Sequence, residues 1–468
     1  MHRYIVHALL SISWFVMHPS AGVSCFAQLP QPVNEPALHG SLINDTVAVG
    51  TAVEREAPKS QWYKGNLHTH SLWSDGDDFP EMIVDWYRER GYSFLALSDH
   101  NILSEGEKWI SLAEVEKRGG KQAFLKYQAR FPDGWIETQS SSDLPSPDSL
   151  AKVRLQTLSK IQAAFEVPGK FLLIPSEEIT DKGVHINATN IGELIEPQGG
   201  ASFVDMVRNN LRAVGEQTQS SGRDILPFLN HPNLSDRGVS AEELAWIVES
   251  RFFEVWNGVE GDGDLGSVKR HSLERMWDIT TTLRLTEYQA APMFGLATDD
   301  SHDYNGKQKA KPGRGWIQVR ADSLSTQSIL AAMRAGDFYS STGVELTQLE
   351  FDPVQRRLSL QIRADGDARF TTRFIGTRRD YDRTTTPRTD PESGEVVPGI
   401  LDYSLEVGQV LATVQGLQAE YQFTGDELYV RAEVISSKAP EFPTSESPWQ
   451  KCWTQPCGWQ IEQTKPNN

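Results

Sequence analysis

Histidines recur along this chain at points where short apolar segments end. The first two are His68 and His70, in the segment GNLHTH at 65–70. On a strand, successive side chains point to opposite faces, so these two imidazoles would point the same way and could bind one metal ion. A lone His-x-His pair is more often an accident of surface composition. A metal site therefore requires further ligands elsewhere in the chain.

The further candidates follow later apolar segments. They are Asp75, His100, Glu178, His185, His231, Asp300 and His302. Six of the eight histidines beyond residue 27 belong to this set, and only His39 and His271 stand apart. Packing alone does not explain such a distribution, so we predict a metal centre. Six imidazoles among nine ligands favour Zn, Mn or Fe over Mg or Ca.

A repeat of strands and helices would position these residues. Apolar residues spaced by three and four predict a helix over 77–90, and the apolar run 92–97 after it predicts a strand. About seven such units recur up to residue 345, and most of their strands end in polar residues. In parallel α/β folds, sites are built at that end of the strands. We therefore expect an α/β fold with a TIM-like (β/α)7 barrel over 59–345.

Two regions depart from this repeat. Segment 104–170 interrupts it, with a loop expected over 131–148, and would form either a lid or pocket wall or mere surface decoration. Beyond residue 345 the pattern changes to short alternating strands separated by turns, which predicts a small β-sandwich-like domain over 346–468.

The N-terminus has the features of a secretory signal. A short basic start precedes a largely apolar run, and residues 1–27 would be removed after Ala27. A lipoprotein anchor on Cys25 is the minor alternative, and 28–58 would be a flexible lead-in. No other segment is long and apolar enough to span a membrane. In an exported chain, Cys452 and Cys457 could close a disulfide loop, the alternative being two buried free thiols.

The net charge of −18 limits the range of partners. An acidic surface repels nucleic acid backbones and anionic membranes, so a role in coating polynucleotides is excluded. A small anionic substrate could still bind, because metal ions dominate the field around them.

Taken together, the motifs resemble those of the PHP family, which is named for its polymerase-associated and histidinol-phosphatase members. The motifs are HTH with SDG at 68–76, SDHN at 98–101, PSEEI at 175–179, His185, NHP at 230–232 and DSH at 300–302. They appear in order and cover about 60–345. The resemblance implies a distorted (β/α)7 barrel with two or three divalent metal ions. Exported members with a β appendage are similar to a carbaryl-hydrolase-like branch that cleaves amide or carbamate bonds.

The resemblance also implies how the ligands are shared. His68, His70, Glu178 and Asp300 would hold one metal, and Glu178 would bridge to a second metal held by His185 and His231. Asp75, His100 and His302 would serve a third. Asp75 stands where some relatives have histidine. Glu178 is preferred to Glu177 because it directly precedes Ile179-Thr180, as the ligand does in relatives.

This cluster suggests a hydrolytic reaction. Two metals ~4 Å apart lower the pKa of a shared water and clamp the attacking and leaving oxygens, so a metal-bound hydroxide would be the nucleophile. Asp99 would orient a ligand histidine. Arg314 would hold a substrate anion or be a solvated loop charge. We expect an exported metal-dependent phosphoesterase. The alternatives are an amidase, carbamate or ester hydrolase on the same core, and a carbohydrate- or surface-binding protein with a vestigial barrel.

Overall fold

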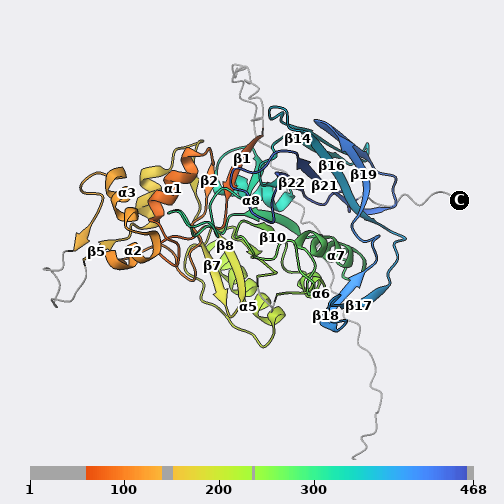
Figure 1. The fold of residues 1–468 in the computed structure, drawn as a ribbon, viewed down its shortest axis with the longest axis horizontal. Helices are drawn as coiled ribbons and strands as arrows, with labels where there is room; N and C mark the ends of the chain where they lie inside the picture. Colours follow the sequence, from red (N-terminus) through yellow and green to blue (C-terminus); the bar gives the residue numbers. More distant parts are fainter. Residues whose placement is uncertain (1–59, 140–150, 235–237, 461–468) are drawn as a thin grey trace, which may run out of the picture. The chain divides into compact units, whose positions relative to one another are not determined.

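The structure is a computed structural model that describes residues 60–139, 151–234 and 238–460 (Figure 1). These residues belong to one compact unit, Glu56–Asn468. The predicted signal peptide, the Cys25 anchor and the lead-in at 28–58 lie outside the described residues. None of the described helices is both long and apolar enough to cross a bilayer.

The strands that lead to the candidate ligands form two sheets. The first contains three parallel neighbours, β1 (Gln61–Asn66), β2 (Phe94–Leu95) and β6 (Leu172–Leu173). The second has the order β11-β10-β9-β8-β7, with β7 at Ser176–Asp181, β8 at Val184–Thr189, β9 at Leu226–Leu229, β10 at Phe252–Asn257 and β11 at Phe294–Thr298. Isolated parallel bridges, Thr69 to Ser301 and His100 to Glu178, link the two sheets.

The chain is a mixed α/β protein, but the predicted barrel is not closed by a continuous ladder of hydrogen bonds among the described strands. Strands β7 and β8 pair antiparallel, because the two-residue turn at Lys182 and Gly183 leaves no room for a helical crossover. Strand β12 (Trp316–Ala321) also runs antiparallel to β1. The prediction of successive parallel units was therefore wrong at these two places.

Helices cover the sheets and begin mostly at residues that cap them. The described helices are α1 (Pro80–Glu89), α2 (Leu112–Gly119), α3 (Gln122–Arg130), α4 (Leu158–Phe165), α5 (Phe203–Ser221), α6 (Ala241–Trp246), α7 (Leu273–Thr286) and α8 (Thr326–Ala335). From α4 to α8, a Ser or Thr hydroxyl at the N-cap accepts a backbone N–H of the first turn. Ser240 and Glu243 complete a capping box at α6.

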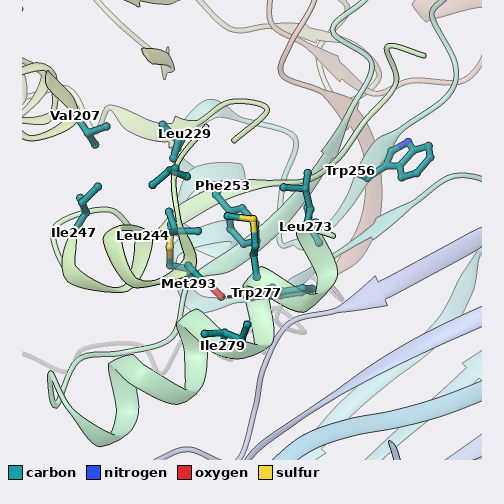
Figure 2. Packing of buried hydrophobic residues seen from close by; sticks show 14 of the residues in the cluster. Val207, Leu229, Leu244, Ile247, Phe253, Trp256, Leu273, Trp277, Ile279 and Met293 are labelled. Atoms are coloured by element: carbon teal, nitrogen blue, oxygen red, sulfur yellow. Dashed lines mark hydrogen bonds between the residues drawn. The ribbon is translucent and has the colours of Figure 1, made fainter. Parts of the chain in front are cut away.

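A buried cluster fixes β10, the strand that turns out to support the metal centre. Phe253 and Val255 on one face of β10 pack with Leu229, and α6 and α7 contribute residues such as Trp277 (Figure 2). The Trp277 indole N–H donates to the carbonyl of Met293 at 2.8 Å. Because side chains alternate along a strand, this packing turns the side chain of residue 254 to the opposite face.

The inserted segment packs against α1 and the β1–α1 loop. It carries α2, α3, α4 and a small sheet of β3 (Trp109–Ser111), β5 (Lys152–Arg154) and β4 (Thr138–Gln139). Phe79, the N-cap residue of α1, stacks on Tyr127 of α3 at 3.8 Å between ring centroids. The Trp73 indole donates to the carbonyl of Gln156 at 3.0 Å, so the inserted segment supports the loop that follows His70. A role as a lid or pocket wall stays a prediction.

The β-rich C-terminal region continues the first sheet, whose order is β19-β16-β21-β22-β13-β12-β1-β2-β6. Its strands are β13 (Phe338–Ser341), β16 (Phe370–Arg378), β19 (Gln409–Gln415), β21 (Glu427–Ser436) and β22 (Lys451–Thr454). A separate three-stranded sheet of β14 (Leu346–Asp352), β15 (Arg357–Ile362) and β20 (Gln418–Gln422) shares a core with the first sheet. Strands β17 (Thr385–Thr389) and β18 (Val396–Tyr403) form a hairpin. A domain boundary at 345/346 stays a prediction.

The two cysteines are free thiols, so the predicted disulfide loop was wrong. The backbone of Cys452 pairs with Val434 of β21, whereas that of Cys457 pairs with Val430. Four residues along a strand separate these partners by ~13 Å. A disulfide needs Cα atoms within about 7 Å of each other, so the sheet register keeps the thiols apart.

Candidate metal centre

The first two candidate ligands follow β1 rather than lie within it, yet they point the same way as expected. Nε2 of His68 and Nε2 of His70 lie 3.1 and 3.0 Å from Oδ1 of Asp300. The parallel bridge between Thr69 and Ser301 keeps the two segments in this register. His68, His70 and Asp300 are one of three groups whose ligand atoms lie within 4.8 Å of one another.

Glu178 lies at the centre of the arrangement and is fully buried. Its Oε1 is 3.4 Å from His68 Nε2 and 3.0 Å from His185 Nδ1. The same oxygen is 3.3 Å from His231 Nε2, and Oε2 is 2.8 Å from His100 Nδ1. Glu177 points elsewhere and accepts the backbone N–H of Ile195 at 2.7 Å. Glu178 is therefore the residue of this pair that joins the cluster.

Asp75 assembles a further group at the mouth of the site. Its Oδ1 is 3.3 Å from His302 Nε2 and 3.5 Å from His70 Nδ1. Its Oδ2 is 3.5 Å from His100 Nε2. The Asp75 side chain is 55% exposed, whereas His68, His70 and Glu178 are fully buried, so this group is the one open to solvent. The structure thus brings all nine sequence candidates together, and their role as ligands stays a prediction.

Unusual backbone conformations hold two of these residues in place. Asp300 has a φ of 45° and His231 a φ of 23°, both outside the region that non-glycine residues favour. Each follows a strand directly or nearly so, Asp300 after β11 and His231 after β9. Strained residues of this kind cluster at functional sites, where the surrounding structure holds them. Asn257 supports Asp300 by donating to its Oδ2 at 3.2 Å.

Glu254 is the functional residue that the sequence reasoning missed. It is fully buried on β10, and its Oε1 lies 2.6 Å from Nδ1 of His68. Its Oε2 accepts the backbone N–H of His231 at 2.7 Å. A carboxylate behind a histidine fixes the ring orientation and leaves Nε2 free to bind a metal. The only signal in the sequence was a charged residue inside the apolar run FFEVWN.

The cluster has strongly displaced pKa values. Burial lowers the pKa of His68, His100, His231 and His302, but the neighbouring carboxylates outweigh it. They raise the pKa of His68 well above its ordinary value, that of His100 to about 10 and those of His231 and His302 to about 9. At His70 burial prevails, and the pKa is lowered. Burial raises the pKa of Glu178, yet the surrounding histidines lower it well below its ordinary value. The carboxylates thus stabilise positive charge, which either protons or divalent cations can supply.

Two buried ring nitrogens without hydrogen-bond partners indicate whether a metal ion fits the cluster. Nε2 of His68 and Nε2 of His70 approach Asp300, but neither contact has hydrogen-bond geometry. Unpartnered buried polar atoms are costly, and native structures satisfy most of them. A divalent cation bound between these nitrogens and the Asp300 oxygen would satisfy both. The donor set of imidazoles and carboxylates suits Zn, Mn or Fe.

Asp99 and Arg314 make other contacts than the sequence predicted. Asp99 accepts from the backbone N–H groups of Ser71 and Ser74 at 2.8 and 3.0 Å, and it reaches His70 only through Ser74. Its described hydrogen bonds therefore anchor a loop and orient no histidine directly. Arg314 is buried and donates to the carbonyls of Gly258, Lys309 and Gln308. Its guanidinium braces a loop instead of facing a substrate anion.

A pocket of about 460 Å³ adjoins the cluster. His100, Glu178, His185, His231, Asp300 and His302 form one side of it. The exposed residues Lys307 and Lys309 form part of the other side, on the loop that Arg314 braces. Asp262 also lines the pocket, where burial raises the pKa of its carboxyl to about 7.

Comparisons with known proteins give only distant matches. No family model matches the chain, and no curated protein does. A chain from Bacteroides vulgatus ATCC 8482, described as a two-domain protein containing a predicted PHP-like metal-dependent phosphoesterase, is 13% identical with a TM-score of 0.35; the match covers 86% of this chain and 98% of that chain. A chain from Bifidobacterium adolescentis ATCC 15703, described as a metal-dependent phosphoesterase, is 11% identical with a TM-score of 0.30, covering 58% and 95%.

The description of the Bacteroides vulgatus chain names a PHP-like protein. Neither description mentions the carbaryl-hydrolase-like branch, which is not confirmed.

Proposed function

We propose that this chain is a metal-dependent hydrolase that cleaves a phosphoester bond in a small anionic substrate. The observation that carries the proposal is the clustering of nine imidazole and carboxylate side chains, from segments 68–302, around one of their number, the buried Glu178, which contacts five of the histidines. An ordinary packed core does not gather buried titratable groups at this density, because each costs desolvation energy.

Two or three divalent ions fit the arrangement. His68, His70 and Asp300 would hold one ion, with Glu178 between it and a second ion near His185 and His231. Asp75 and His302 would hold a third together with His100. Bound there, such ions would lower the pKa of water and stabilise an anionic transition state. Glu254 would keep His68 oriented, and the positive φ of Asp300 would keep its carboxylate turned toward the histidines.

The charge of the pocket wall supports an anionic substrate. Lys307 and Lys309 are exposed on the loop opposite the cluster, in a chain whose net charge is −18. A phosphate group held by metal ions on one side would meet these ammonium groups on the other. The pocket, at about 460 Å³, suits a small molecule. It is these lysines, and not Arg314, that we expect to contribute to substrate affinity.

The test is a substrate panel on chain loaded separately with Zn, Mn and Fe. We expect release of phosphate from phosphomonoesters, or of an alcohol and a phosphomonoester from phosphodiesters, and no hydrolysis of aryl carbamates at a comparable rate. Turnover of carbamates without hydrolysis of either class of phosphoester in all metal forms would contradict the phosphoesterase proposal. His68→Ala should abolish turnover while the protein stays folded. The matched control is His271→Ala, which removes a histidine outside the cluster.

Export also belongs to the proposal and depends on residues 1–27 alone. The apolar run and the small residues before Gln28 favour removal of a signal peptide. N-terminal sequencing of the protein made in its own host would show a start at Gln28. A start at Met1 would contradict export. The free thiols of Cys452 and Cys457 give export no support.

A further inference from the structure

A second pocket, of about 420 Å³, opens at the opposite end of the strands from the metal centre. It is lined by Arg251, which directly precedes β10, and by Phe294, the first residue of β11. The ligands Asp300 and His302 follow the other end of β11. The two pockets have no lining residue in common, and three residues of β10, roughly 10 Å, separate Arg251 from Glu254, the residue beside His68. This arginine pocket, as we call it, is therefore distinct from the metal centre.

Arg251 is the residue that calls for an explanation. Its Nε is buried and has no hydrogen-bond partner, and no carboxylate of the described residues lies within ion-pair distance of it. Its guanidinium carbon lies 5.1 Å from the centroid of the Phe294 ring. Burial, and then the charge of Arg334, lower its pKa. A half-buried cation without an anionic partner is unfavourable unless an anion binds to it.

Positive charge also exceeds negative charge in the pocket wall. Arg334 is paired with Asp224 at 2.6 Å, and Arg320 with Asp337 at 2.7 Å. Three arginines thus line the pocket, and two of them have carboxylate partners. In a chain with a net charge of −18, an excess of cations in one hollow is not a consequence of composition.

Aromatic side chains form part of the wall. Trp62, Phe351 and Trp459 line the pocket together with Phe294. Trp62 is held edge-on against Tyr339 at 5.0 Å between ring centroids, and Phe351 contacts Phe423 at 5.4 Å. Such rings offer apolar surface to a ligand whose charged end meets the arginines.

We propose that the arginine pocket binds a small oxyanion attached to an apolar or aromatic group. Arg251 would donate to the oxyanion, and the aromatic wall would cover the attached group. The binding is independent of the metal centre and does not rest on the proposed function.

Isothermal titration calorimetry with phenylphosphonate on the full metal-loaded chain would test the proposal. Phenylphosphonate has a P–C bond in place of an ester bond, so ester hydrolysis cannot cleave it. We expect one equivalent bound at the metal centre, which His68→Ala weakens, and a second bound at the arginine pocket, which His68→Ala retains because the pocket lies away from the ligands. At the arginine pocket, inorganic phosphate should bind more weakly, since it lacks the ring, and phenol should not bind measurably. Arg251→Gln should weaken the binding of phenylphosphonate there by about tenfold or more, because it removes a charge-assisted hydrogen bond.

A second variant guards against loss of folding in Arg251→Gln. Ala335 lines the pocket and is exposed at the end of α8, so Ala335→Glu would add a negative charge without disturbing the core. It should abolish binding at the arginine pocket, whereas Ala331→Glu, exposed on the same helix but outside the pocket, should not. Arg369→Gln is the matched surface control for Arg251→Gln. Unchanged binding in both Arg251→Gln and Ala335→Glu, or loss of all binding in His68→Ala, would overturn the proposal.

Discussion

Buried carboxylates organise the metal centre at the scale of single residues. Glu178 contacts five histidines directly, and Glu254 stands behind one of them. The two glutamates differ in role because their oxygens meet different atoms. Glu178 shares its oxygens among ring nitrogens in the cluster, whereas Glu254 also binds the backbone of His231 and the hydroxyl of Thr298.

Replacing Glu254 with Gln should lower metal affinity. The change removes the negative charge 2.6 Å from Nδ1 of His68 and so weakens the ligand on its far side. We expect a loss of about 10- to 100-fold in metal affinity or turnover, as for other residues that orient a ligand. Equilibrium dialysis against Zn would measure it. Glu350→Gln, an exposed change on β14, should leave the affinity unchanged, and equal affinity in both variants would contradict the role.

Most ligand positions could be predicted from the sequence because they follow strand ends, where a local pattern marks them. Glu178 and His185 lie within β7 and β8, and the motif PSEEI and the family resemblance indicated them instead. Glu254 could not be predicted, because it lies in the middle of a strand and resembles a core position with one unusual residue. Arg314 was misplaced for a related reason. A loop arginine looks the same in sequence whether it meets a substrate or, as here, the carbonyls of its own loop.

At the scale of elements, the β1–α1 loop depends on Asp99. This buried residue accepts backbone N–H groups from Ser71 and Ser74 and hydroxyl groups from the same two residues. Asp75 follows Ser74 in this loop, so its place at the mouth of the site depends on the same anchor.

Asp99→Ala should therefore destabilise the chain and loosen the outer ligand group. Removing the acceptor leaves buried donors unsatisfied, which costs about 1–3 kcal/mol. Chemical denaturation would measure the loss, and metal content should fall at the group that contains Asp75. Asp133→Asn, an exposed change in the inserted segment, serves as the control. A stability equal to that of the control would contradict the anchoring role.

Most helices and strands near the site were predictable because their apolar spacing and caps are local. The helix expected over 77–90, for example, is α1 at Pro80–Glu89. The direction of a strand relative to its neighbours could not be predicted from the local sequence. The return of β8 against β7 depends on the positive φ of Lys182 and Gly183, and the direction of β12 on its pairing with β1, more than 250 residues away.

At the scale of the whole molecule, stability should depend on pH in a direction set by the cluster. The folded pKa values of His100, His231 and His302 are about 10, 9 and 9, above their ordinary value of 6.5. Their contribution to stability is fully present below pH ~6.5 and is lost as the pH rises through about 9 to 10. The lowered pKa values of Glu178 and Asp300 make stability depend on pH only at acidic pH.

The Tm of chelator-treated chain should accordingly fall between pH 6.5 and 10. Metal-loaded chain should show a smaller fall, because the ligands then hold cations in place of protons. Differential scanning calorimetry of both forms in the same buffers makes the comparison. His231→Gln should reduce the fall in the chelator-treated form. A Tm that stays level or rises over this range would contradict the assignment of protons to the cluster.

If the nine side chains hold divalent ions, the chain should contain those ions. Its metal content is therefore the most direct test. Chain reloaded with Zn, Mn and Fe and freed of loose ions should retain about two or three equivalents by elemental analysis. Glu178→Gln should lose at least one equivalent of metal, because the Glu178 carboxylate contacts members of more than one of the groups of candidate ligands. His271→Ala should lose none. Less than one equivalent of all three metals combined in the reloaded wild-type chain would contradict the account.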